Sequence, residues 1–272
     1  MTTDLADVPA SASPRHDATA INRAFYDHLW AKVRWPAPER FNTWTLVDGW
    51  CREASTRLEV GPGMRPRLPI AGTRFVDLSP ACVERLRAGG ADAQCGSATA
   101  LPFADRSTAL VCAFDIIEHV EDDQRVLSEL VRVLADGGRL VLSFPLFAAR
   151  WTPFDAMCGH VRRYEPPRVL AMLAEHGLEI VESAGYGMQP RQWLVDFGMF
   201  WFKAMPRRAM FLYNHVLMPI GLKMQQELTL TAGTAALTNG NHDEVLLVCR
   251  RRALRNEEPH DGQPPRGSTT QT

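Results

Sequence analysis

The sequence predicts an α/β fold built on a doubly wound, mostly parallel sheet. Short apolar runs alternate with helical segments from residue 57 onward, as in chains made of βαβ units. The run Ala109–Phe114 (ALVCAF) is apolar throughout, which is typical of a strand buried on both faces of a parallel sheet. The run Arg57–Val60 leads directly into Gly61-Pro62-Gly63, a tight turn at the end of a strand.

The individual elements follow from periodicity and from capping residues. Ser79 offers an N-cap and Pro80 suits the first helical position, so a helix begins there and closes at Gly89-Gly90. Asp122 or Asp123 can cap the next helix, which we expect to end at Gly137-Gly138. Further helices are predicted at 21–33, 41–54 and 167–176, and strands at 57–60, 73–78, 109–114, 139–144, 178–183 and 244–249.

The organisation is that of one domain between two tails. At 272 residues, with 46% hydrophobic and 22% charged residues, the chain can bury one substantial core. Residues 1–18 and 255–272 are polar and rich in Pro, Gly and Ser, so we expect them to be disordered. The single domain spans 19–254, with N-terminal helices at 20–54 and a helical insert at about 187–242.

Charge and cysteine usage limit the class of protein. Lys plus Arg number 30 and Asp plus Glu number 31, so nothing in the charge balance indicates nucleic-acid binding. The six cysteines form no CxxC pair and no Cys/His ligand spacing, so no metal site is predicted. The N-terminal residues lack the apolar core of a signal peptide, and no apolar run reaches spanning length. These features predict a cytoplasmic protein with reduced thiols.

The glycine turn and an acidic residue predict a ligand site. Asp77 follows Gly61 by 16 residues, at the tip of the second strand, where a carboxylate can accept hydrogen bonds from both ribose hydroxyls. A pyrophosphate-binding loop would need the third glycine of G-x-G-x-x-G, which is missing here. The following segment, 64–71, is also too short and too proline-rich for a full crossover helix, which disfavours NAD as the ligand.

At these residues the chain resembles the class I S-adenosylmethionine (SAM)-dependent methyltransferases, over roughly 20–185 and the final strand. The matching motifs are LEVGPG (58–63), FVDLS (75–79), GSATALPF (96–103), DIIEHVED (115–122) and LADGGRLVLSFP (134–145). The resemblance implies a Rossmann-like sheet with an antiparallel last strand, SAM as the cofactor, and methyl transfer as the activity. A SAM-binding protein without transfer activity and a nucleotide-dependent oxidoreductase are the alternatives.

The resemblance also implies which residues meet the cofactor. Glu59, Gly61 and Gly63 would approach its methionine part, while Asp77 would hold the ribose and Leu78 would pack on the adenine. The remaining implied contacts are Ser97 and Ala98 at the adenine edge, and Phe114 and Asp115 along the cofactor. Ser97 stands where the family usually has Asp, and Arg65 replaces the third glycine.

The segment 145–164 follows the 139–144 strand and resembles a bacterial subgroup with a D-x-x-x-G-H-x-R-R-Y pattern. The segment leaves the carboxyl end of a strand next to the cofactor, so we expect it to face the acceptor, with Arg162, Arg163 and Tyr164 as substrate residues and Arg162 or Arg163 binding an anionic group. His160 and His119 are the candidates for a general base. The alternatives are that the arginines pair with Asp155 or cap carbonyls, and that His119 only begins a turn.

The insert at 187–242 is rich in Met and aromatic residues. Three interpretations stay open: core packing or a homodimer contact, a lid over a hydrophobic acceptor, and peripheral contact with a membrane surface. We therefore expect a small-molecule or lipid-like acceptor. Because the methyl group of SAM is already activated, the protein must chiefly align the acceptor in line with methyl carbon and sulfur, and it needs a base only if the acceptor must lose a proton.

Overall fold

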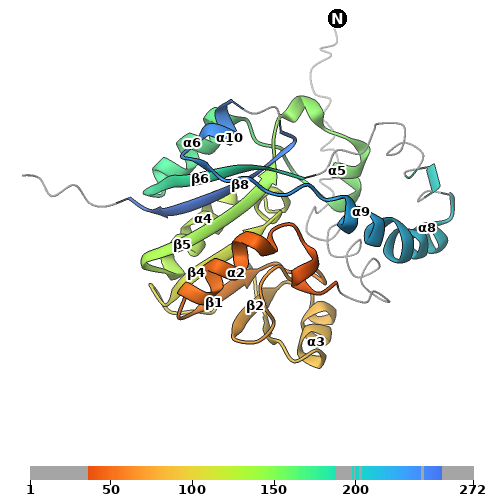
Figure 1. Cartoon of the computed structure of the whole chain (residues 1–272), viewed down its shortest axis with the longest axis horizontal. Coiled ribbons are helices and arrows are strands. Elements are labelled where there is room, and N and C mark those ends of the chain that lie inside the picture. Colours follow the sequence, from red (N-terminus) through yellow and green to blue (C-terminus); the bar gives the residue numbers. More distant parts are fainter. Residues whose placement is uncertain (1–35, 188–197, 199, 202–203, 240–241, 253–272) are drawn as a thin grey trace, which may run out of the picture.

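The computed structural model describes residues 36–187, 198, 200–201, 204–239 and 242–252 (Figure 1). The helix predicted at 21–33 and both predicted tails lie outside these residues. Among the described helices, none combines the length and the apolar character that crossing a membrane requires.

The centre of the described part is an eight-stranded sheet with the order β3-β2-β1-β4-β5-β8-β6-β7. The five neighbouring strands β3, β2, β1, β4 and β5 pair in parallel. By contrast, β8 is antiparallel to both of its neighbours, β5 and β6. The mostly parallel sheet with an antiparallel last strand is thus confirmed. The strands are β1 Arg57–Val60, β2 Thr73–Asp77, β3 Asp92–Cys95, β4 Thr108–Phe114, β5 Leu134–Pro145, β6 Leu178–Tyr186, β7 Thr231–Ala232 and β8 Glu244–Arg251.

Helices connect the strands and begin where side chains cap them. Ser79 Oγ accepts a hydrogen bond from the Cys82 amide at 3.3 Å, and Asp122 Oδ1 accepts one from the Arg125 amide at 2.9 Å, as the sequence predicted. The α-helices are α2 Trp44–Glu53, α3 Pro80–Ala88, α4 Asp123–Val133, α5 Pro153–Cys158, α6 Pro166–Glu175, α8 Pro206–Leu212, α9 Met218–Met224 and α10 Ala235–Thr238. Shorter helical turns are η1 Pro38–Arg40, η2 Ile117–His119, η3 Ala148–Arg150 and the π-helical η4 Tyr213–Leu217.

The prediction was wrong at β3 and at the end of α4, and the short elements β7 and α5 were not predicted either. The strand β3 was missed, because its sequence DAQC is polar and it pairs only with β2 at the edge of the sheet. The helix α4 ends at Val133, not at Gly137-Gly138, because Leu134 already pairs with Thr108 of β4. The two glycines instead lie within β5, where Gly137 adopts a φ of 71°.

The core lies on both faces of the sheet, and successive residues of β4 divide between the faces. Val111 and Ala113 pack in a cluster with side chains of α4, α6 and α10, whereas Leu110 and Cys112 pack in a second cluster with side chains of α2. This alternation is the period of two expected of a strand. Both faces of β4 are buried, so its uniformly apolar sequence is explained.

The parallel strands β1 and β2 are joined by residues 61–72 without a helix. The carboxylate of Glu59 accepts hydrogen bonds from the amides of Arg67, at 3.0 Å, and Leu68, at 2.9 Å. The side chains of Met64 and Leu68 are fully buried. Backbone hydrogen bonds and apolar burial therefore replace the packing that a crossover helix would provide.

A second anchor fixes the loop after β3. Glu129 on α4 accepts a hydrogen bond from the Leu101 amide at 2.7 Å and forms an ion pair with Arg132 at 2.8 Å. Arg132 in turn donates to the carbonyls of Leu101, at 2.9 Å, and Phe103, at 2.7 Å. The helix α4 thereby holds the loop that carries Ser97 and Ala98.

We predict that Glu129→Gln lowers the free energy of unfolding by about 1–3 kcal/mol at pH 7, because a buried, charge-assisted network loses its carboxylate. Hydrogen bonds from Arg132 lower the pKa of Glu129 below its ordinary 4.5. A lowered folded-state pKa stabilises the protein above the unfolded-state pKa, and that stability is lost as the pH falls through the folded-state value. The difference between wild type and variant should therefore shrink as the pH falls below about 4.5.

Urea denaturation at pH 7 and at acidic pH measures this difference. The control is Glu84→Gln, which changes an exposed glutamate on α3. Equal effects of the two substitutions, or a difference that does not change with pH, would contradict the role given to Glu129.

Candidate functional site

A cavity of about 450 Å³ lies at the carboxyl ends of β1, β2 and β4. Its size is within the range of small-molecule sites. The order of the sheet reverses between β1 and β4, and ligands of open α/β sheets bind at such a switch point. The lining comes from four segments, at residues 59–67, 76–79, 96–99 and 114–122.

Every residue that the sequence analysis expected beside the cofactor lines this cavity. They are Glu59, Gly61, Gly63, Asp77, Leu78, Ser97, Ala98, Phe114 and Asp115. His119 also lines it, whereas His160, Arg162, Arg163 and Tyr164 do not. Residues of four of the motifs therefore line one pocket, whereas the segment 145–164 contributes no residue to its lining.

The glycine turn is shaped by close contacts and by Asp77. Gly61 has a φ of 67°, and a Cβ at this position would overlap the side chain of Ile116. Asp77 accepts hydrogen bonds from the amides of Gly63 and Ser79, each at 2.9 Å. A carboxylate has about four lone-pair positions, so it can accept several hydrogen bonds at once.

Glu59 holds the loop from within. It is buried, and its two oxygens accept from the backbone at Arg67 and Leu68. Burial raises the pKa of Glu59 and these hydrogen bonds lower it; burial dominates, and the resulting pKa is about 7. The carboxylate thus shapes the loop, and a direct approach to a ligand stays a prediction.

Arg67 is a pocket residue that the sequence reasoning missed. Its guanidinium lies 3.9 Å from the centre of the Phe41 ring and donates through Nη2 to the Tyr186 hydroxyl at 3.2 Å. Its Nε and Nη1 are buried and have no hydrogen-bond partner within the described residues. Burial opposes the charged form, but the surrounding Tyr186, Asp115 and Glu59 raise the pKa of Arg67. No motif marks it, because only the fold of residues 61–72 brings it to the pocket.

Two further pocket segments have defined local structure. Ser97 Oγ lies 2.7 Å from Thr99 Oγ1 and 3.2 Å from the Thr99 amide, so the serine hydroxyl closes its own turn. Asp115 has a φ of 54°, a conformation that costs a non-glycine residue about 1–2 kcal/mol. Ser143 compensates, since its carbonyl accepts from the Asp115 amide at 3.0 Å and its hydroxyl donates to Asp115 Oδ1 at 2.6 Å.

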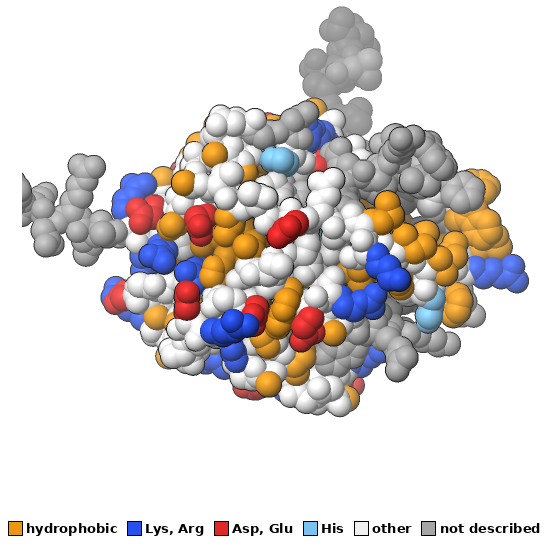
Figure 2. All heavy atoms as spheres, in the orientation of Figure 1, with side chains coloured by type: hydrophobic (Ala, Val, Ile, Leu, Met, Phe, Trp, Pro, Cys, Tyr) orange, Lys and Arg blue, Asp and Glu red, His pale blue; other side chains and the backbone are white. Residues whose placement is uncertain are grey.

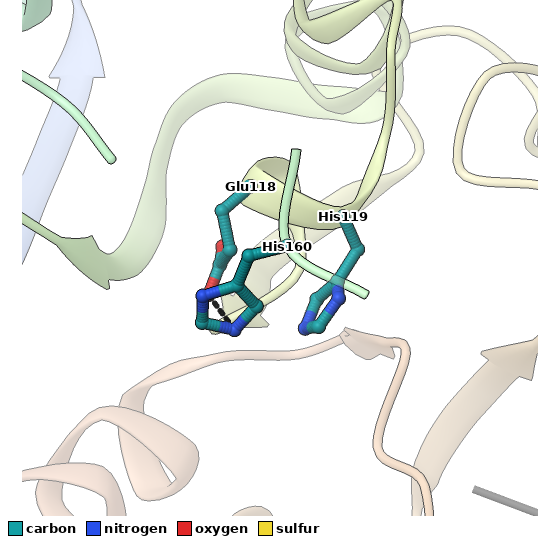
Figure 3. A group of neighbouring side chains, drawn as sticks. All are labelled: Glu118, His119 and His160. Atoms are coloured by element: carbon teal, nitrogen blue, oxygen red, sulfur yellow. Dashed lines mark ion pairs between the residues drawn. The ribbon is translucent and has the colours of Figure 1, made fainter. Parts of the chain in front are cut away.

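Glu118 and His119 lie in η2 and are both buried. His119 Nδ1 is 3.3 Å from the Gly159 carbonyl oxygen, and its ring meets that of His160 edge to face at 4.6 Å between centroids (Figure 3). The amide of His119 also closes a turn with the Ile116 carbonyl at 3.0 Å, so the residue both forms a turn and faces the pocket. Burial lowers the pKa of His119 to about 3, and His160 adds to this, so the ring is neutral at pH 7.

Arg162 and Tyr164 both bind Asp123 at the start of α4. Arg162 Nη1 lies 2.6 Å from Asp123 Oδ2, and the Tyr164 hydroxyl donates to the same oxygen at 3.2 Å. Arg162 Nη2 also donates to the Glu121 carbonyl at 2.7 Å. The side chain of Tyr164 is buried. These contacts support a structural role, and acceptor binding by this pair stays a prediction.

Arg163 is also tied into the fold. It forms ion pairs with Asp155, at 2.9 Å, and with Asp243, at 2.8 Å. Burial raises the pKa of Asp155, but hydrogen bonds from His160, Arg163 and Thr152 outweigh it and leave that pKa below its ordinary range. The pairing with Asp155 is the structural alternative that the sequence left open, and the geometry favours it over acceptor binding.

The described part of the insert reaches the edge of the pocket. Arg65, a lining residue, donates to the Tyr213 hydroxyl at 3.2 Å and lies 5.5 Å from the centre of that ring. Beyond Tyr213, apolar side chains gather on the surface of α8, η4 and α9, at the right of Figure 2. The exposed members are Phe211, Leu212, Val216, Leu217, Ile220 and Met224. Packing between copies, a lid and membrane contact all remain open.

Known proteins share both the sequence pattern and the fold. Residues 59–142 match the family described as "Methyltransferase domain". A probable S-adenosylmethionine-dependent methyltransferase of Mycolicibacterium smegmatis is 30% identical over 116 residues, which cover 40% of this chain and 44% of that protein. An uncharacterized methyltransferase of Mycolicibacterium gilvum is 30% identical over 113 residues, covering 38% and 44%. The matched segment thus spans less than half the length of either relative.

Solved structures agree in fold. A SAM-dependent methyltransferase from Thermotoga maritima has a TM-score of 0.53 at 16% identity, covering 86% of this chain and 92% of that one. A structure from Galdieria sulphuraria has a TM-score of 0.52 at 16% identity, covering 87% and 99%. The fold is therefore the Rossmann-like fold of these proteins, and residues 59–142, which contain most of the pocket lining, match the methyltransferase domain family.

Proposed function

We propose that this protein is a SAM-dependent methyltransferase. The observation that carries the proposal is the pocket itself, which combines a glycine turn, the Asp77 carboxylate at the end of β2 and the segment after β4. These features lie within the residues that match the methyltransferase domain, and two relatives are named as methyltransferases. The missing third glycine and the short, proline-rich segment 64–71 do not suit a pyrophosphate-binding alternative.

The lining suggests how SAM binds. Asp77 accepts the ribose hydroxyls, Leu78 packs on the adenine, and Ser97 and Ala98 border its edge. Gly61 and Gly63 let the backbone approach the methionine part, while Arg67 supplies positive charge for the methionine carboxylate. Phe114 and Asp115 lie along the cofactor. Because the Ser97 hydroxyl is engaged in its own turn, it binds the adenine amino group more weakly than an aspartate would.

The reaction is an in-line displacement. SAM supplies an activated methyl group, so the chain has to align the acceptor atom with the methyl carbon and the sulfur, and to exclude water. No base is required unless the acceptor must lose a proton. His119 on the pocket wall and His160 behind it are the candidates for that proton transfer.

A small-molecule or lipid-like acceptor fits the apolar insert. Tyr213 ties η4 to the pocket edge through Arg65, so side chains of the insert can cover an acceptor that enters there. A homodimer contact and peripheral membrane contact are the other uses of the same surface. A cytoplasmic location and membership of the GHxRRY subgroup also stay predictions.

The direct test is to incubate the purified protein with SAM and candidate acceptors and to measure S-adenosylhomocysteine. We expect product above the rate of SAM breakdown without protein, and incorporation of a labelled methyl group into an acceptor. SAM binding without product from any acceptor class would favour a SAM-binding protein without transfer activity. Saturable NAD(P) binding with no SAM binding would overturn the proposal.

Gly61→Arg should weaken SAM binding by at least about 100-fold, because a side chain at this position overlaps Ile116 and enters the pocket. The matched control is Gly90→Arg. Gly90 has a similar backbone conformation, with a φ of 88°, but nothing lies within 4 Å of a Cβ there. The control should keep SAM affinity within about threefold despite the same backbone strain. Calorimetric titration measures both, and equal losses would argue against the placement of the pocket.

Arg67→Met should weaken SAM binding by about 10–100-fold, since a charge-assisted hydrogen bond contributes about 1.5–3 kcal/mol. Binding of 5′-methylthioadenosine should change little, because this ligand has no carboxylate. Titration of wild type and variant with both ligands separates the two effects. An equal loss for both ligands would mean that Arg67 only shapes the pocket.

A further inference from the structure

We propose that Glu118, His119 and His160 bind a divalent transition-metal ion at the wall of the pocket. These side chains come from two segments, η2 and the loop that follows α5. Each offers one ligand atom, and these atoms all lie within 4.8 Å of one another (Figure 3). The figure shows the three side chains converging on the same small volume.

Glu118 provides the strongest argument. Its side chain is fully buried, and neither carboxylate oxygen has a hydrogen-bond partner within the described residues. Its backbone is fixed, because the Glu118 carbonyl accepts from the Val161 amide at 2.8 Å. A buried carboxylate is normally hydrogen-bonded, paired with a charge or bound to a metal. Two carboxylate oxygens without a hydrogen bond in the described part of the chain therefore point to a cation.

His160 has the arrangement that metal-binding histidines show. Its Nδ1 lies 2.9 Å from Asp155 Oδ1, while its Nε2 lies 4.0 Å from Glu118 Oε1. A carboxylate that accepts from Nδ1 fixes the tautomer and leaves Nε2 as the ligand atom. Asp155 is itself held by Arg163 and by Thr152, so the orientation of the ring is set by several contacts.

His119 repeats this arrangement with a backbone partner. Its Nδ1 lies 3.3 Å from the carbonyl oxygen of Gly159, the residue before His160. A carbonyl in this position selects the Nδ1–H tautomer, which binds metals through Nε2. The two imidazole rings are inclined at 80°. Two imidazoles and one carboxylate can thus approach an ion from different directions.

The donor set selects the class of ion. Two imidazole nitrogens and one carboxylate oxygen suit Zn²⁺, Fe²⁺, Co²⁺ or Mn²⁺, whereas Ca²⁺ and Mg²⁺ prefer oxygen ligands throughout. Zinc–nitrogen bonds are about 2.0–2.1 Å long, so the side chains must close in slightly around an ion. Three protein ligands leave a coordination position for water or substrate.

The position of His119 on the pocket wall suggests what the open coordination position does. It would take an oxygen or nitrogen donor of the acceptor and so orient its lone pair; this role rests on the proposed methyl transfer. The metal site itself does not depend on that function. If the histidines bind an ion through Nε2, that nitrogen of neither ring is available as a general base.

The test is titration of chelator-treated, full-length protein with Co²⁺, followed by visible absorption, and with Zn²⁺, followed by calorimetry. We expect one ion per chain. Glu118→Gln and His160→Gln should each weaken binding at least tenfold. His215→Gln, which changes an exposed histidine on η4, should leave it unchanged. Far-UV circular dichroism checks that each variant folds.

Absence of stoichiometric Co²⁺ and Zn²⁺ binding by the wild type would overturn the metal site. So would equal affinities in Glu118→Gln, His160→Gln and His215→Gln. The wild-type titration alone decides the matter if the buried substitutions do not fold. SAM affinity is measured separately in the metal-free protein, so failure of the metal site and failure of the proposed function are distinguishable.

Discussion

The carboxylate of Glu59 holds the helix-free connection between β1 and β2, and the pocket depends on that interaction. A crossover without a helix has no packed face of its own, so its backbone needs other partners. Hydrogen bonds from the amides of Arg67 and Leu68 to Glu59 supply them, while Met64 and Leu68 fill the core. The same turn places Gly63 on Asp77 and turns Arg67 toward the pocket. One buried acid thereby links the fold to the candidate cofactor site.

Much of the fold could be predicted from short-range signals. The strands at 57–60 and 109–114 and the caps Ser79 and Asp122 depend on a few adjacent residues, and the structure confirms them. The errors have long-range causes. The edge strand β3 has no apolar pattern. The helix α4 ends before Leu134 because Leu134 pairs with Thr108 of β4.

The candidate site divides in the same way. Residues such as Gly61, Asp77 and Asp115 could be predicted because each lies at or directly after the carboxyl end of a strand, and such ends meet in one pocket. The place of Arg67 in the pocket and the proximity of Glu118 to His160 could not be predicted. Their proximity depends on how distant segments fold together, and spacing along the chain does not encode it. The expectation of no metal, drawn from cysteine and histidine spacing, could not address such a group.

Contacts within the segment 145–164 orient His160, while acceptor binding by this segment stays a prediction. Arg163 binds Asp155, and Asp155 orients His160, so residues that resemble acceptor contacts in sequence hold a second layer of side chains in place. This arrangement brings His160 beside Glu118 at the pocket wall. Cofactor cleft and candidate metal site thus share the wall formed by η2.

The central claim is that the pocket at β1, β2 and β4 binds SAM. Calorimetric titration of the wild-type protein with SAM, S-adenosylhomocysteine and NAD(P) tests it most directly. The account predicts saturable binding of SAM and S-adenosylhomocysteine, one molecule per chain, and no binding of NAD(P). Saturable binding of NAD(P) without binding of SAM would contradict it.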